Sequence, residues 1–315
     1  MWAGFIGFVL VMLALDLFVL GGRKAHRVHV KEAATWVAVW VSLALTFAGL
    51  LWWYLNETQG AEVARTKVLE FLAGYLIEQS LSVDNMFVFV MIFTYFAVPP
   101  ELQRRVLLYG VLGAIVMRAG MIFAGVWLVE QFSWVLYLFG AFLVITGIKM
   151  LIFAKAEPDL EKNPILRWLR GHLRITPEFH GESFFVQQSG ILWATPMFLV
   201  LALIEASDLV FAVDSIPAIF AVTTDPFIVF TSNIFAIMGL RALYFLLADM
   251  ADRFHLLKYG LAIVLVFIGG KMLAMPWFHV PIQWSLTIVA SIIMLSVSAS
   301  MLLSNKKSSV TGEEP

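Results

Sequence analysis

Two groups of polar residues lie inside apolar stretches that are long enough to cross a membrane, at about residues 69–98 and 193–222. Their members, in chain order, are Glu78, Asp84, Asn85, Glu205, Asp208 and Asp214. A carboxylate at the centre of a bilayer costs roughly 2.5–3.5 kcal/mol on insertion scales. Five carboxylates in two such stretches therefore indicate a function that needs negative charge within the membrane, such as the passage of a cation.

The spacing within the second group suggests how an ion would be bound. Glu205 and Asp208 are separated by three residues, so they share one face of a helix and can grip one ion. Asp214 lies six residues beyond Asp208, about 9 Å along a regular helix and off that face. Because Pro217 cannot donate a hydrogen bond to the carbonyl of Val213, we expect a kink that swings Asp214 toward Asp208. Glu78, Asp84 and Asn85 would then line the opposite side of the ion site.

All of these candidate ligands are oxygen donors. The chain has no cysteine, and its six histidines fall in loops or at the ends of apolar stretches. Carboxylates, a carboxamide and backbone carbonyls suit hard divalent cations such as Mn²⁺, Mg²⁺ or Ca²⁺. We expect such an ion to be a transported substrate, and we expect no permanently bound cofactor.

Four further residues are possible accessories to this site: Asp16, Arg118, Asn233 and Arg241. The arginines are expected to balance charge rather than to bind the ion. The alternative is purely structural, with Asp208 or Asp214 paired to an arginine inside the helix bundle. We favour function because two arginines cannot neutralise five acids.

Composition places the chain in a membrane. It is 61% hydrophobic and only 14% charged, more apolar than a soluble domain of 315 residues can bury. The net charge of −1 gives no indication of nucleic-acid binding. The chain lacks a GxxxxGK[ST] phosphate-binding loop, and the apolar stretches lack the histidines of a membrane metalloprotease. We therefore expect a protein that is not an enzyme.

The apolar stretches predict an all-α polytopic protein with nine transmembrane helices in a single domain, residues 1–303. The first stretch reads as a membrane helix rather than a cleaved signal peptide. The longest connection, residues 155–192, is expected to form a polar cap with an amphipathic helix at about 165–173. Residues 304–315 form a short polar tail. The nine spans are 2–21, 34–55, 69–97, 106–130, 133–154, 193–222, 226–249, 256–275 and 280–303.

The basic residues predict the orientation. In this arrangement 15 of the 21 lysines and arginines lie on one side of the membrane, four lie within spans, and only Arg65 and Lys67 lie on the other side. Because basic loops stay in the cytoplasm, the N-terminus is expected outside and the C-terminus inside.

The chain also repeats itself. Asp84 and Asp208 lie 124 positions apart, while Arg118 and Arg241 lie 123 apart, each arginine being followed by alanine. Gly-Ile-Lys-Met-Leu, which contains Lys149, resembles a second segment 122 positions later. Each unit holds three spans, about residues 69–154 and 193–275, so the second unit enters the membrane from the opposite face. Transporters with such inverted repeats bind substrate near the midplane, where the units meet.

The segments Ser-Leu-Ser-Val-Asp-Asn, ending at Asn85, and Glu-Ala-Ser-Asp through Asp-Ser-Ile-Pro, residues 205–217, resemble the two motifs of the TerC family. The resemblance covers roughly residues 1–300. It implies a multi-pass protein of the bacterial inner membrane that exports manganese. Older family labels also imply tellurite resistance or redox modulation, without transport. A chain without cysteine has little with which to carry electrons.

The direction of transport bears on the mechanism. Expelling a divalent cation against an inside-negative potential of 100 mV costs roughly 4.6 kcal/mol, at about 2.3 kcal/mol per charge. Inward protons are the simplest source of this free energy, since clustered carboxylates can hold protons or a metal ion but not both. The sequence therefore predicts a cation/proton antiporter, with transport of another hard divalent ion, or a stress-response partner without transport, as alternatives.

Overall fold

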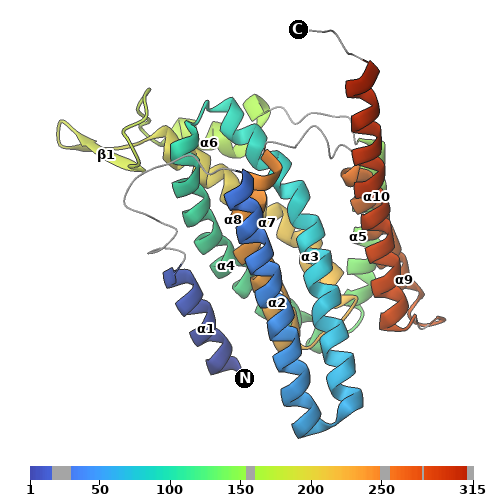
Figure 1. The fold of residues 1–315 in the computed structure, drawn as a ribbon. Helices are drawn as coiled ribbons and strands as arrows, with labels where there is room; N and C mark the ends of the chain where they lie inside the picture. Colours follow the sequence, from blue (N-terminus) through green and yellow to red (C-terminus); the bar gives the residue numbers. More distant parts are fainter. Residues whose placement is uncertain (16–29, 154–159, 249–255, 279, 311–315) are drawn as a thin grey trace.

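The computed structural model describes residues 1–15, 30–153, 160–248, 256–278 and 280–310. Helices dominate these residues (Figure 1). In chain order the elements are α1 Trp2–Leu15, α2 Val30–Gln59, α3 Ala61–Tyr95, α4 Pro100–Gln131, α5 Val135–Ile152, the short 3₁₀ helix Leu160–Lys162, α6 Pro164–His172, β1 Phe185–Gln188, β2 Ile191–Ala194, α7 Pro196–Phe220, α8 Pro226–Ala248, α9 Leu257–Ala274 and α10 Ile282–Val310.

Within the described ranges, eight helices are long and apolar enough to cross a membrane, namely α2 to α5 and α7 to α10. They confirm the all-helical membrane fold. The first predicted span corresponds to α1, which is apolar but only 14 residues long, and the rest of that stretch, including Asp16, lies outside the described residues. The polar tail predicted for 304–315 begins within α10 and ends outside the described ranges.

Helix starts follow local chemistry. Four proline residues occupy the first helical position, where the missing N–H costs nothing; they begin α4, α6, α7 and α8. Asn163 caps α6 by accepting hydrogen bonds from the backbone N–H of Ile165 and Leu166, at 2.9 and 3.3 Å. The Asp225 carboxylate accepts one from the Phe227 N–H, at 3.0 Å, and so caps α8.

Two features differ from the predicted boundaries. The helix predicted to begin near residue 69 begins at Ala61, and only Gly60 separates it from the end of α2, so α2 and α3 form a long helical hairpin around Gly60. The span predicted from residue 193 begins at Pro196, because residues 185–194 form a small antiparallel β-hairpin. The amphipathic helix predicted at 165–173 is confirmed as α6, whose Leu166 and Leu169 are buried.

The helices pack in three related ways. α3 runs parallel to α8. Lys67 pairs with Asp225 near the start of both helices, and the Phe93 and Tyr244 rings are in contact near their ends. α4 runs parallel to α7, since a Cβ at Gly110 would meet Ile204 and one at Gly125 would meet Phe220. α5 and α9 are antiparallel instead.

The α5–α9 contact is close because glycines face backbone. A Cβ added at Gly269 would lie 2.6 Å from the carbonyl oxygen of Gly140, and one at Gly147 would lie 2.8 Å from that of Ala262. Among these spans α8 is the most enclosed, since 89% of its apolar 18-residue segment is buried, whereas α2 and α10 are peripheral. The core therefore surrounds α8, and α3, α4 and α7 bring their polar residues to its flank.

Candidate functional site

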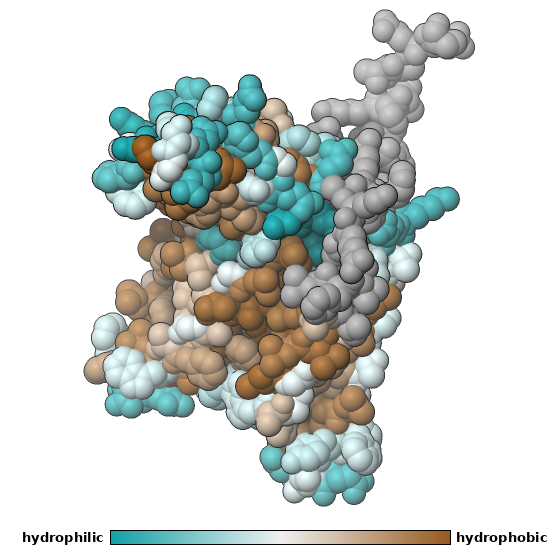
Figure 2. All heavy atoms as spheres, turned by 90° about the vertical axis from the view of Figure 1, so that its left-hand side faces the viewer, coloured by the Kyte–Doolittle hydropathy of each residue, from teal (hydrophilic) through white to brown (hydrophobic). Residues whose placement is uncertain are grey.

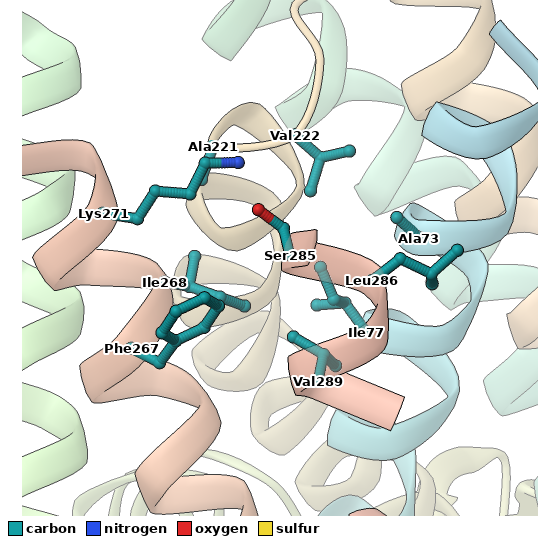
Figure 3. A pocket seen from close by; sticks show the side chains of 10 residues that line it. All are labelled: Ala73, Ile77, Ala221, Val222, Phe267, Ile268, Lys271, Ser285, Leu286 and Val289. Atoms are coloured by element: carbon teal, nitrogen blue, oxygen red, sulfur yellow. The ribbon is translucent and has the colours of Figure 1, made fainter. Parts of the chain in front are cut away.

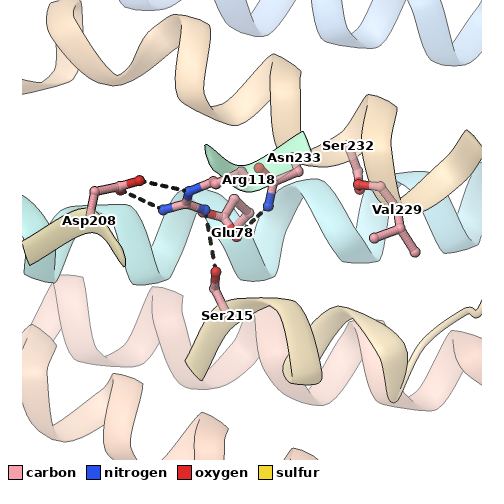
Figure 4. A network of polar contacts seen from close by, with 7 residues as sticks. All are labelled: Glu78, Arg118, Asp208, Ser215, Val229, Ser232 and Asn233. Atoms are coloured by element: carbon pink, nitrogen blue, oxygen red, sulfur yellow. Dashed lines mark hydrogen bonds and ion pairs between the residues drawn. The ribbon is translucent and has the colours of Figure 1, made fainter. Parts of the chain in front are cut away.

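Arg118 of α4 lies at the centre of a buried polar network (Figure 4). Its guanidinium donates two hydrogen bonds to the Asp208 carboxylate on α7, at 3.1 and 2.8 Å, in a bidentate arrangement. It also forms an ion pair with Glu78 of α3. A longer contact of 3.3 Å reaches the Ser215 hydroxyl. One cation thus joins carboxylates from two helices that belong to different predicted repeats.

The network extends to α8 through Asn233. The side-chain amide of Asn233 donates to the second oxygen of Glu78 at 3.1 Å, while the Asn233 carbonyl oxygen is buried without a hydrogen-bond partner. Glu78, Arg118 and Asn233 are all fully buried. Two carboxylates share one guanidinium, so the three ionisable side chains carry a formal charge of −1 when both acids are ionised.

A small cavity adjoins this network between α3, α5, α7 and α9. Its volume is about 40 Å³, and a site for one water needs about 10–15 Å³. It can therefore admit an ion with one or two waters. Its polar lining comprises Glu78, Asp84, Asn85, Arg118, Thr146, Asp214 and Ser215.

Asp84 and Asp214 face this cavity from the two predicted repeats. Asp84 lies within electrostatic range of both Asp214 and Lys258. A side-chain hydrogen bond joins Asp214 to Thr146 of α5, and Lys149 lies close enough to interact with its charge. The Asn85 side-chain oxygen is buried and has no hydrogen-bond partner. The cavity thus combines two carboxylates with neutral oxygen donors.

The structure separates residues that the sequence was expected to bring together. Asp208 is held by Arg118, whereas Asp214 lines the cavity beyond it, and α7 continues through Pro217 as a helix. Glu205 lies against Gly113 of α4, where an added Cβ would come within 2.1 Å of its carboxylate. One Glu205 oxygen is buried and has no hydrogen-bond partner. Glu205 and Asp208 therefore have different neighbours, Gly113 and Arg118 respectively.

No group of three acidic, histidine or cysteine side chains converges to hold a metal ion anywhere in the described ranges. An ion in the cavity would be bound by one or two carboxylates together with carboxamide and hydroxyl oxygens and its own waters. Such incomplete coordination by protein oxygens is typical of hard divalent cations. Such partial coordination suits an ion that binds only transiently.

The predicted accessory residues fall in three places. Arg118 forms ion pairs with Glu78 and Asp208, and Asn233 joins its network. Arg241 lines a separate cavity with Glu32, Trp36 and Arg104. Asp16 lies outside the described residues.

A second cavity is positive rather than negative. Lys271 of α9 points toward Ala221 at the end of α7, with Ser285 of α10 nearby (Figure 3). The other lining residues are apolar, and the volume is only about 10 Å³. An ammonium group near a helix C-terminus complements the helix dipole. No acidic side chain is among the described residues that line this cavity.

Sequence reasoning missed Thr146 and Ser215 as parts of the site. Ser215 directly follows Asp214 in the second motif, and Thr146 directly precedes the repeated segment that contains Lys149. Their position beside these motifs was the available signal. A hydroxyl in a membrane helix commonly satisfies itself on its own backbone, so residue type alone did not distinguish them.

The fold and this site define a polytopic helical membrane protein with charged residues buried between its spans. The sequence matches the TerC family of integral membrane proteins over residues 63–310. The chain belongs to this family.

Relatives agree with this assignment. The chain is 58% identical to proteins of Salmonella typhi and Escherichia coli K12 named "Putative membrane-bound redox modulator Alx", over 94% of this chain and 92% of each relative. It is 49% identical to a Myxococcus xanthus protein named "Uncharacterized membrane protein STKORF319", over 100% of this chain and 96% of that one. No solved structure matches.

Proposed function

We propose that the protein is a secondary transporter that exports Mn²⁺ from the cytoplasm in exchange for protons. The observation that carries this proposal is the cavity between α3, α5, α7 and α9, which is lined by oxygen donors in the interior of membrane spans. Carboxylates in such places are costly and mark ion pathways. Mn²⁺ is the substrate, and no resident cofactor is part of the proposal.

The donor set supports a hard divalent ion. Asp84 and Asp214 would supply charge, while Asn85 and Thr146 would supply neutral oxygens. Mg²⁺ and Ca²⁺ use the same donors, so transport of either is the nearest alternative. Arg118 neutralises part of the charge of Glu78 and Asp208, which leaves the negative charge concentrated on the cavity side.

The counter-ion follows from the same carboxylates. When Mn²⁺ leaves the cavity, protons can replace it on Asp84 and Asp214, since two nearby carboxylates are not readily ionised together without a cation. Inward proton movement would then supply the roughly 4.6 kcal/mol needed to expel a divalent ion against 100 mV.

The packing supports alternating access between two inverted repeats, α3–α5 and α7–α9. Equivalent helices of inverted repeats must be antiparallel, as α5 and α9 are. The parallel pair α3–α8 likewise has the parallel pair α4–α7 as its counterpart. The cavity lies where the two units meet, the usual place of a transported substrate in such folds. The basic loops would place the N-terminus outside and the C-terminus in the cytoplasm of a bacterial inner membrane.

A stress-response role without transport is the second candidate. The observation in its favour is the name of the Alx relatives, which refers to redox modulation. The absence of cysteine removes thiol chemistry from this chain, so a redox role would have to act through another molecule.

Ion flux into proteoliposomes tests the proposal. We expect uptake of Mn²⁺ that is driven by an imposed proton gradient and is reduced at least about tenfold in Asp84→Asn and Asp214→Asn, each of which removes a charged ligand. Asp208→Asn is expected to impair flux through the Arg118 network. Glu178→Gln, in an exposed loop, is the control.

Each outcome has a distinct meaning. Flux of Mg²⁺ or Ca²⁺ in preference to Mn²⁺ would change the substrate but keep the site. Mn²⁺ flux that does not change with an imposed proton gradient would contradict exchange for protons. No flux of any divalent ion through correctly folded protein would reject transport and favour the stress-response role.

A further inference from the structure

The polar cap that precedes α7 carries a β-hairpin with large apolar side chains on its surface. β1 and β2 are joined by Ser189 and Gly190, which both have positive φ, as in a tight type I′ turn. Ile191 and Leu192 are exposed, Leu192 by 65% of its surface. Figure 1 shows the hairpin extending sideways beyond the bundle, level with one end of the helices.

The hairpin lies at the level where a span begins. β2 ends at Ala194, and α7 begins two residues later at Pro196. The ring centroid of Phe185 lies 4.6 Å from that of Phe198, in the first turn of α7. The hairpin is therefore fixed against the very end of a membrane helix, with its tip reaching beyond the bundle.

Strand register determines which face of the hairpin is turned toward that helix. Phe185 pairs with Ala194, and Gln187 pairs with Leu192, so these four side chains share one face. Phe185 packs on α7, and Leu192 continues the same face outward. Ile191 lies on the opposite face. In Figure 2 the cap is mostly hydrophilic above, and hydrophobic residues gather along its lower edge, toward the apolar belt of the spans.

We propose that this hairpin is an interfacial anchor, with Leu192 inserted at the boundary between the lipid headgroups and acyl chains of the adjacent leaflet. Leu192 is exposed and shares the face whose Phe185 packs against the start of α7, so its side chain is placed to meet lipid beside that helix end. Apolar and aromatic residues at this depth gain burial without leaving polar groups unsatisfied. Exposed Arg174, whose backbone carbonyl accepts a hydrogen bond from the Ala194 N–H at 2.8 Å, lies within reach of headgroup phosphates. The inference is independent of ion transport.

The absence of cysteine makes a direct test possible. A nitroxide is attached to Leu192→Cys in lipid nanodiscs, and its collisions with oxygen, which dissolves in lipid, are compared with those with a water-soluble nickel chelate. Ile191→Cys is the matched control, because it is the adjacent, apolar and exposed residue on the other face. We expect oxygen to dominate at position 192 and the nickel chelate to dominate at position 191.

Two results would overturn the proposal. Equal, high nickel accessibility at both positions would mean that the hairpin projects into water and that its apolar face serves a soluble partner. A Leu192→Asp variant that raises nickel accessibility of a label at Gln187→Cys supports insertion, whereas no change there contradicts it. Unfolding temperatures measured in detergent, where no leaflet exists, confirm that each variant is folded.

Discussion

Arg118 forms ion pairs with two buried carboxylates from different helices, Glu78 and Asp208. A buried ion pair gives little net stability, but removing one partner leaves an uncompensated charge in a medium of low polarity. Removing Arg118 should therefore cost more free energy of unfolding than the ion pairs contribute to it, because Glu78 and Asp208 would be left charged and unpaired. This is the behaviour expected of a residue that balances charge rather than of one that binds the transported ion.

Arg118→Gln is therefore expected to destabilise the protein by about 3–5 kcal/mol, because two acids lose their counter-charge. Arg118→Gln combined with Asp208→Asn should recover part of this loss. Unfolding in detergent measures both variants, with exposed Arg174→Gln as the control. Equal stability of Arg118→Gln and wild type would show that the carboxylates find other partners.

Gly113 makes room for the Glu205 carboxylate, and a methyl group there would overlap it. Gly113→Ala should cost about 1–3 kcal/mol through overpacking. Gly120→Ala, in the same helix with nothing within 4 Å of the added Cβ, should be neutral or slightly stabilising. The difference between the two unfolding temperatures is the measurement, and no difference would mean that Glu205 moves aside freely.

At the scale of the helices, hydropathy predicts eight of the nine expected spans as helices long enough to cross a membrane, because the bilayer sets their length. It does not locate their ends, as α3 and α7 illustrate. Arg65 and Lys67 look like loop residues by charge but lie in the first turns of α3, where Lys67 pairs with Glu70 and Asp225 at 3.0 and 2.8 Å. The acidic residues were identifiable as a group, but which of them share a cavity depends on helix rotation, which periodicity in uniformly apolar segments does not reveal.

The α5–α9 contact offers a sharp test of helix packing. A methyl group at Gly269 would lie 2.6 Å from the Gly140 carbonyl, whereas at the next residue, Gly270, it would meet nothing within 4 Å. Gly269→Ala should lower stability by about 1–3 kcal/mol or more, because backbone cannot yield as a side chain can. Gly270→Ala should not. Similar unfolding of both variants would contradict the close approach of the two helices.

At the scale of the whole molecule, the α2–α3 hairpin and the polar cap lie at opposite ends of the bundle (Figure 1). The basic loops predict that the cap is cytoplasmic. A membrane-impermeant maleimide applied to intact cells should therefore label Thr58→Cys, near the end of α2, and should leave Gln188→Cys unlabelled until the membrane is opened. The reverse labelling pattern would mean that the protein has the opposite orientation in the membrane, and the proposed direction of transport would then be reversed.

The proposed inverted repeat also predicts a second state. By their spacing in the sequence, Arg118 and Asp208 would correspond to Arg241 and Asp84 of the other unit. If the two units exchange conformations during transport, Arg241 should approach Asp84 when access reverses. The pairing is tested by proximity rather than by flux, because Asp84 is also a proposed ligand of the ion. The cysteine pair Asp84→Cys with Arg241→Cys should form a disulfide when access reverses, and no cross-link in any transport condition would reject this pairing.

The length of the α2–α3 hairpin has a practical consequence. The 35 residues of α3 extend about 50 Å at 1.5 Å each, whereas the hydrocarbon core is only about 30 Å thick. Gly60, with φ of 94°, joins two helices at its tip with a single residue. A stiff helical extension of this kind can carry a fused protein in a fixed orientation. For a membrane protein of 35.3 kDa, such a fusion would supply the particle-alignment mass that electron cryomicroscopy requires.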